Sequence, residues 1–118
     1  MLGTYTKCLS AALLVASNAV VSSAVLAAPG VDDERILFGQ TAAFEGPAAA
    51  LGQGMNRGLE AAFRRVNADG GIDGRSLVLT TANDGYEPDT AIANTKTFIN
   101  ETGVFALIGA VGTPTSKA

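Results

Sequence analysis

The stretch 76–109, "SLVLTTANDGYEPDTAIANTKTFINETGVFALIG", decides the fold because it holds a strand, a helix and a second strand in that order. Residues 76–82 are rich in strand-forming side chains. From Pro88 to about Thr102, apolar residues recur on one side of a helix, and Gly103 is placed to end it. Residues 104–109 form a short apolar run, which is typical of a buried strand.

The residues before this stretch extend the same alternation. The run from Ile36 to about Thr41 predicts a strand, and apolar spacing predicts a helix from about Ala49, which residues 67–71 terminate with two glycines. The apolar positions of this helix are Leu51, Met55, Leu59, Ala62, Phe63 and Val66. The order β-α-β-α-β predicts an α/β fold with a parallel sheet, helices on both faces and the first strand in the centre.

A ligand site is expected at the carboxyl ends of the strands, where the strand order reverses. The loops at this edge are 42–51 and 110–116, the stretches richest in glycine, proline and hydroxyl residues. In the second loop Gly112 precedes Thr113, where a helix should begin and unpaired N–H groups attract a carboxylate. Thr113 either caps that helix or turns its hydroxyl toward a ligand.

Residues 1–27 have the order of a cleaved secretory signal: the basic Lys7, an uncharged apolar stretch over 8–26, and the small residue Ala27 at the cleavage site. An uncleaved anchor is the alternative, because the apolar stretch is close to the ~20 residues that cross a bilayer. We expect export to the periplasm, with residues 28–34 as an acidic leader.

Composition argues against several function classes. The only cysteine, Cys8, lies in the expected signal, and the chain has no histidine, so thiol and imidazole catalysis have no obvious residues. The net charge of −3 disfavours nucleic acid as a partner. An acidic helix start explains the only carboxylate cluster, Asp84 with Glu87 and Asp89, better than a metal site does. We therefore expect no enzyme activity, cofactor or metal.

Nucleotide binding remains an alternative. Residues 52–58 have a G-x-G-x-x-x-G spacing close to the dinucleotide fingerprint, and Asp84 follows the second strand as a possible ribose partner. The fingerprint glycines belong in the turn directly after the first strand, whereas these fall in the first turns of the expected helix. Glycines there are better explained by close packing of backbone against backbone.

The sequence from Ile36 to Ser116 resembles the opening of the type I periplasmic binding proteins of the leucine/isoleucine/valine-receptor group, which are substrate-binding components of ABC importers. The most specific pieces are "GP" followed by "LG" before the long helix, then "VNADGGIDGRSLVL", and "IGAVGTPTS" at the third strand. The resemblance implies two doubly wound lobes that close on a ligand. Residues 35–118 would be the first half of the N-terminal lobe, without the second lobe or the hinge.

The resemblance also implies site residues. A hydroxyl residue just after the third strand binds the amino acid's carboxylate in such proteins, and Thr113 matches it, with Gly112 and Thr115 beside it. An aromatic residue in the loop before the first helix often touches the ligand, and by its offset from Pro47 that position is Leu51 here, which suits a more apolar ligand. Phe44 in the same loop completes the candidate set.

The expected function is therefore an exported solute-binding receptor, non-enzymatic and monomeric, which holds an amino acid or a related carboxylate or amide and delivers it to an importer permease. Two alternatives remain: a nucleotide-binding enzyme module of the same sheet class, and an inactive gene fragment.

Overall fold

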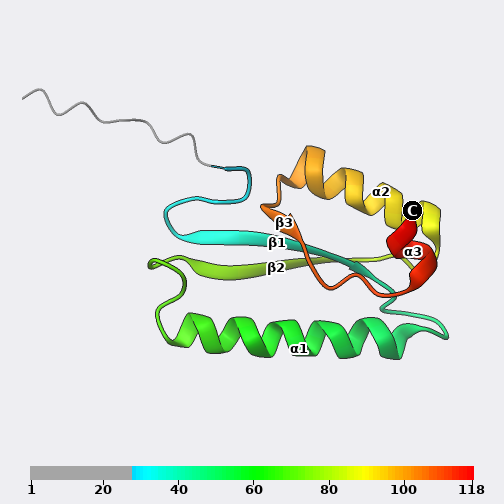
Figure 1. Cartoon of the computed structure of the whole chain (residues 1–118), viewed down its shortest axis with the longest axis horizontal. Coiled ribbons are helices and arrows are strands. Elements are labelled where there is room, and N and C mark those ends of the chain that lie inside the picture. The colour runs from blue at the N-terminus through cyan, green and yellow to red at the C-terminus, as the bar shows by residue number, and fades with distance from the viewer. Residues whose placement is uncertain (1–27) are drawn as a thin grey trace, which may run out of the picture.

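A computed structural model describes residues 28–118 (Figure 1). The signal sequence expected over 1–27 lies outside the described residues. The elements are β1 (Arg35–Ala42), α1 (Ala49–Ala68), β2 (Ser76–Asn83), α2 (Pro88–Thr97), the π-helical turn η1 (Phe98–Thr102), β3 (Ala106–Leu107) and α3 (Thr113–Lys117). Between residues 28 and 118, no helix has the length and apolar character needed to cross a membrane.

The three strands form a parallel sheet in the order β2-β1-β3. The whole of β1 pairs with β2, from Arg35 opposite Ser76 to Ala42 opposite Asn83. Helix α1 covers one face of the sheet, and α2 covers the other (Figure 1). The predicted α/β fold with a central first strand is confirmed.

Strand β1 contributes to the core on both faces, because successive side chains of a strand point in opposite directions. Leu37 packs with Phe98 and Val104 in a buried cluster on the α2 face. Phe38 packs against the ring of Phe63 from α1, with ring centroids 5.4 Å apart. It also meets the ring of Phe105 edge-on at 5.9 Å. These contacts fix α1 and the β3 segment on β1.

Helix α1 begins at the predicted residue and ends before Gly70 and Gly71, which both have positive φ. The prediction of one buried apolar stripe is wrong at three of its six positions, since Leu51 is 55% exposed, Met55 is 42% exposed and Ala62 is also exposed. At the start of α1 the physical reason is that Gly52, which meets the Ala43 carbonyl, is the residue turned toward the protein, so its neighbour Leu51 faces outward.

The close-packing explanation of the α1 glycines is confirmed only at Gly52. A side chain there would overlap the carbonyl oxygen of Ala43. Gly54 and Gly58 face open space, so for them the explanation is wrong.

The second helix reaches Thr102 as predicted, but in two parts. It is α-helical to Thr97 and continues as the π-helical turn η1. Gly103 ends the turn in the left-handed conformation, at φ 66°. The N–H of Val104 then donates to the carbonyl of Phe98 at 3.0 Å, which leads the chain into β3.

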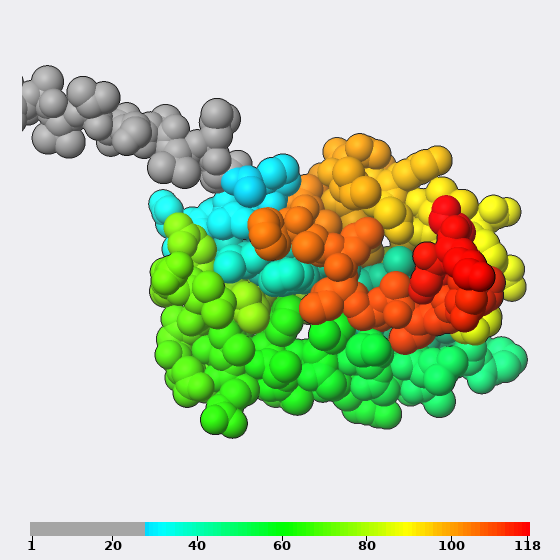
Figure 2. Space-filling view, in the orientation of Figure 1, coloured from blue at the N-terminus to red at the C-terminus, as the bar shows by residue number. Residues whose placement is uncertain are grey.

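Strand β3 is shorter than predicted, since only Ala106–Leu107 is strand, where residues 104–109 were expected. It pairs with β1 alone, and its other edge is open in the described residues. Hydrogen bonds from Phe105 to Leu37 and from Ile108 to Gly39 extend the pairing on either side. Phe105 is 51% exposed and Leu107 42%, and this segment lies at the visible surface in Figure 2. The β3 segment therefore carries exposed apolar side chains.

Candidate functional site

Three connecting segments meet at the carboxyl ends of the strands: 43–48 after β1, 84–87 after β2, and 108–112 between β3 and α3. They lie at the right-hand end of the molecule in Figure 1, where α3 also lies. This is the edge where ligands bind in open parallel sheets.

Asn83 joins the first two segments. Its Oδ1 accepts hydrogen bonds from the N–H of Phe44 at 2.8 Å and from that of Gly85 at 3.1 Å. The carbonyl of Phe44 accepts a further bond from Gln53 Nε2 at 3.0 Å. The backbone of Phe44 is therefore held from both sides, although the residue itself is partly exposed.

Gln40 joins the third segment to the core. It is fully buried on β1. Its Nε2 donates to the carbonyl of Gly109 at 2.9 Å, and its Oε1 accepts from Asn56 Nδ2 of α1 at 3.1 Å. Because a buried amide is costly when unpaired, this arrangement favours one position of the segment that leads to α3.

Asp84 is buried at 2% exposure and points into the protein. Its Oδ2 accepts from Thr41 Oγ1 at 3.1 Å, and its Oδ1 accepts from the N–H of Tyr86 at 2.9 Å. Asn94 Nδ2 in turn donates to Thr41 Oγ1 at 3.1 Å. Asp84 is therefore not placed to bind a ribose, as the nucleotide-binding alternative requires. The glycines of residues 52–58 also do not form a turn after β1, because Gly52 lies inside α1.

The hydroxyl residues near the end of the chain differ in their roles. Gly112, at φ 97°, is the N-cap of α3, and no side chain caps the helix, so the capping role left open for Thr113 is wrong. Thr113 is exposed at the first helical position, while Thr115 Oγ1 donates to the carbonyls of Val111 at 2.7 Å and Gly112 at 3.1 Å. Of the two hydroxyls, that of Thr113 is the one presented to the outside.

A cavity of about 340 Å³ lies beside this turn. Its hydroxyl-bearing lining residues are Thr41, Thr95, Thr115 and Ser116. The five candidate residues thus fall into two groups. Gly112, Thr113 and Thr115 share one turn, whereas Phe44 lies after β1 and Leu51 in the first turn of α1. Within residues 28–118, no hydrogen bond joins the second group to the first.

Sequence reasoning missed Gln40, Tyr86 and Asn94, which organise this edge, and it did not predict that Asp84 turns inward. Their types give a partial signal, since a glutamine inside an apolar strand and an Asn-Asp pair directly after a strand both need polar partners. The identity of those partners depends on contacts between distant segments.

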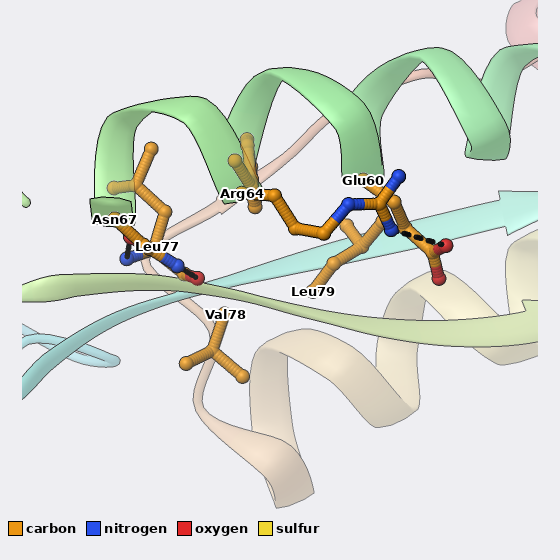
Figure 3. Close-up of a pocket in the computed structure, with 7 residues that line it drawn as sticks. Glu60, Arg64, Asn67, Leu77, Val78 and Leu79 are labelled. Atoms are coloured by element: carbon orange, nitrogen blue, oxygen red, sulfur yellow. Dashed lines mark hydrogen bonds and ion pairs between the residues drawn. The ribbon is translucent and has the colours of Figure 1, made fainter. Parts of the chain in front are cut away.

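A second hollow, of about 350 Å³, lies between α1 and β2 (Figure 3). Its polar side chains are already paired, because Asn67 exchanges two hydrogen bonds with the backbone of Leu77 and Arg64 lies 3.8 Å from Glu60. It is also away from the carboxyl edge. We therefore place the candidate site at the three segments and not here.

A parallel sheet with connecting segments gathered at its strand carboxyl ends is typical of the α/β proteins that bind ligands at this edge. A family model described as "Periplasmic binding protein" matches residues 35–118. The chain belongs to this family, in its type I, leucine/isoleucine/valine-binding-protein-like group.

Individual proteins agree with the family match. The Leu/Ile/Val-binding protein homolog 2 of Brucella abortus (strain 2308) is 34% identical over 97 residues, which cover 79% of this chain and 26% of that protein. A solved structure of a possible leucine/isoleucine/valine-binding protein from Rhodopirellula baltica SH 1 has a TM-score of 0.69 at 39% identity, covering 74% of this chain and 24% of that one. The fatty acid ABC transporter substrate-binding protein of Thermomonospora curvata has a TM-score of 0.67 at 27% identity, with 75% and 22% covered. The chain spans about a quarter of the length of these relatives.

Proposed function

We propose that this chain is part of an exported, non-enzymatic solute-binding receptor of an ABC importer, and that its ligand is an amino acid or a related carboxylate. The receptor works in the periplasm as a monomer, holds its ligand between two lobes and delivers it to a membrane permease. The observation that carries this proposal is the family match over residues 35–118.

The names of two relatives support this ligand class. One relative is named for leucine, isoleucine and valine, and another for fatty acids. Both kinds of ligand combine an apolar chain with a carboxylate. The exposed Leu51 offers an apolar contact, and the exposed hydroxyl of Thr113 offers a hydrogen bond to the carboxylate.

Thr113 supplies the direct test. In the complete receptor that carries this segment, Thr113→Ala removes the hydrogen bond to the carboxylate. The dissociation constant of the bound probe should rise about fivefold or more, since such a bond contributes at least ~1 kcal/mol. Isothermal titration calorimetry with L-leucine and with octanoate measures the change.

Thr97→Ala is the matched control, because Thr97 is also an exposed threonine but lies at the end of α2. Equal affinities of the Thr113 and Thr97 variants would remove Thr113 from the site. The inactive-fragment alternative is tested by the DNA after the codon for Ala118. An open reading frame with further strand and helix patterns supports the receptor, and a stop codon supports the inactive fragment.

A further inference from the structure

We infer that Tyr86 is a positioning residue of the ligand site: its ring supports Gly112 and so sets the turn that presents Thr113. The inference rests on the proposed function and extends it to a residue of the loop after β2.

The backbone of Tyr86 is held in an uncommon conformation. Its φ is +71°, in the left-handed region that side chains other than glycine rarely adopt. Its N–H donates to Oδ1 of the buried Asp84 at 2.9 Å. Asp84 is in turn held by Thr41, so the conformation of Tyr86 is anchored in the core of the sheet. Strained residues that the surrounding structure fixes in this way gather at functional sites.

The ring of Tyr86 fills the space next to Gly112. A Cβ added at Gly112 would lie 2.5 Å from Cε2 and 2.9 Å from Cζ of Tyr86. Since carbon atoms do not approach below about 3.5 Å without repulsion, no side chain fits at position 112 while the ring stays in place. Gly112 also has φ 97°, so both its conformation and its surroundings require glycine.

Gly112 immediately precedes Thr113, so a ring that fixes Gly112 also fixes where the Thr113 hydroxyl points. The turn has a second support, because Gln40 holds the carbonyl of Gly109. Tyr86 therefore holds this turn from the loop after β2, and Gln40 holds it from β1. A site that is preorganised in this way binds its ligand more tightly, because less conformational entropy is lost when the ligand binds.

The first experiment needs no ligand. Hydrogen exchange of the complete receptor, followed by mass spectrometry, is compared for the wild type, Tyr86→Ala and Tyr86→Phe. We expect faster exchange in the peptide 110–116 for Tyr86→Ala, unchanged exchange in α1, and wild-type behaviour for Tyr86→Phe, which keeps the ring. Unchanged exchange at 110–116 in Tyr86→Ala would overturn the inference, as would faster exchange throughout the protein, which would indicate a general structural role.

The second experiment is a double-mutant cycle on the affinity for L-leucine and octanoate. Tyr86→Ala should weaken binding about fivefold or more in the wild-type background and much less in the Thr113→Ala background, because its effect passes through Thr113. Tyr86→Phe should restore the affinity. Equal losses in both backgrounds would contradict positioning through Thr113. If the wild type binds neither probe, the proposed function fails, and the exchange experiment still decides the role of Tyr86.

Discussion

Replacing either of two glycines of α1 by alanine should change the stability of the protein in opposite directions. Gly52 lies against the carbonyl of Ala43, and Gly58 faces open space. Gly58→Ala should raise the free energy of unfolding by about 1 kcal/mol through helix propensity. Gly52→Ala should lower it by about 1–3 kcal/mol because the added methyl group collides with backbone.

Urea unfolding of the chain measures both changes, and each variant serves as the control for the other. A gain in stability from both substitutions would show that α1 is not held against the loop after β1.

Asp32 gives a prediction on pH. The N–H groups of Glu34 and then Arg35 donate to its carboxylate and hold its pKa below the ordinary value, with a smaller contribution from the Arg35 side chain. A lowered pKa in the folded state means that the stabilisation is present above the ordinary pKa and is lost as pH falls toward the folded value.

The stability difference between the wild type and Asp32→Asn should therefore be constant near neutral pH and shrink below about pH 4. Thermal unfolding across pH 3 to 7 tests it, with Asp33→Asn as the control because Asp33 accepts none of these hydrogen bonds. A difference that does not change with pH would show that the charge of Asp32 has no part in holding the turn before β1.

At the scale of single residues, the sequence predicted what depends on local conformation. The glycines that end the helices and the position of Thr113 after the third strand follow from neighbours in the chain. The contacts of Tyr86 with Gly112 and of Gln40 with Gly109 join residues far apart in sequence, and no local pattern specifies them.

At the scale of elements, the outer edge of β2 is unpaired within residues 28–118, and α1 partly protects it. Asn67 donates to the carbonyl of Leu77 at 2.9 Å and accepts from its N–H at 2.7 Å, so one side chain satisfies both backbone groups that face outward (Figure 3). Open strand edges invite pairing with other chains, and a bound side chain blocks one position.

Asn67→Ala should lower the free energy of unfolding by about 1–2 kcal/mol, because two partly buried hydrogen bonds are lost. Chemical denaturation of the chain measures it, with Asn100→Ala as the control at an exposed asparagine of η1. If the Asn67 and Asn100 variants had equal free energies of unfolding, water would replace the hydrogen bonds of Asn67 to Leu77 without loss of stability.

Element boundaries were predictable where a strand or helix has partners along its whole length, as for β1 and β2. The third strand was not predictable in this way, because its pairing with β1 covers two residues only. Residues 104–109 have the composition of a buried strand, yet only Ala106–Leu107 is strand. The π-helical turn η1 could not be predicted either, since the apolar spacing of the second helix does not indicate the change from α-helical to π-helical hydrogen bonding.

At the scale of the whole molecule, the site and the apolar surface lie close together. Phe105 and Leu107, in and directly before β3, are each more than 40% exposed, and the Thr113 turn follows a few residues later in the chain. The matched segment covers only about a quarter of each relative. We expect the apolar surface to be covered, and the ligand to be enclosed, in the complete receptor, because one wall cannot bury the 70% or more of a ligand that such sites bury.

We propose that this segment belongs to a receptor that recognises a carboxylate through the turn at Thr113. The most direct test is a calorimetric titration of the complete receptor with L-leucine and octanoate and with their amides, leucinamide and octanamide. The account predicts saturable binding of one or both acids and at least about tenfold weaker binding of the matching amide, because the amide lacks the charge. Equal binding of acid and amide, or no saturable binding of either acid, would contradict it.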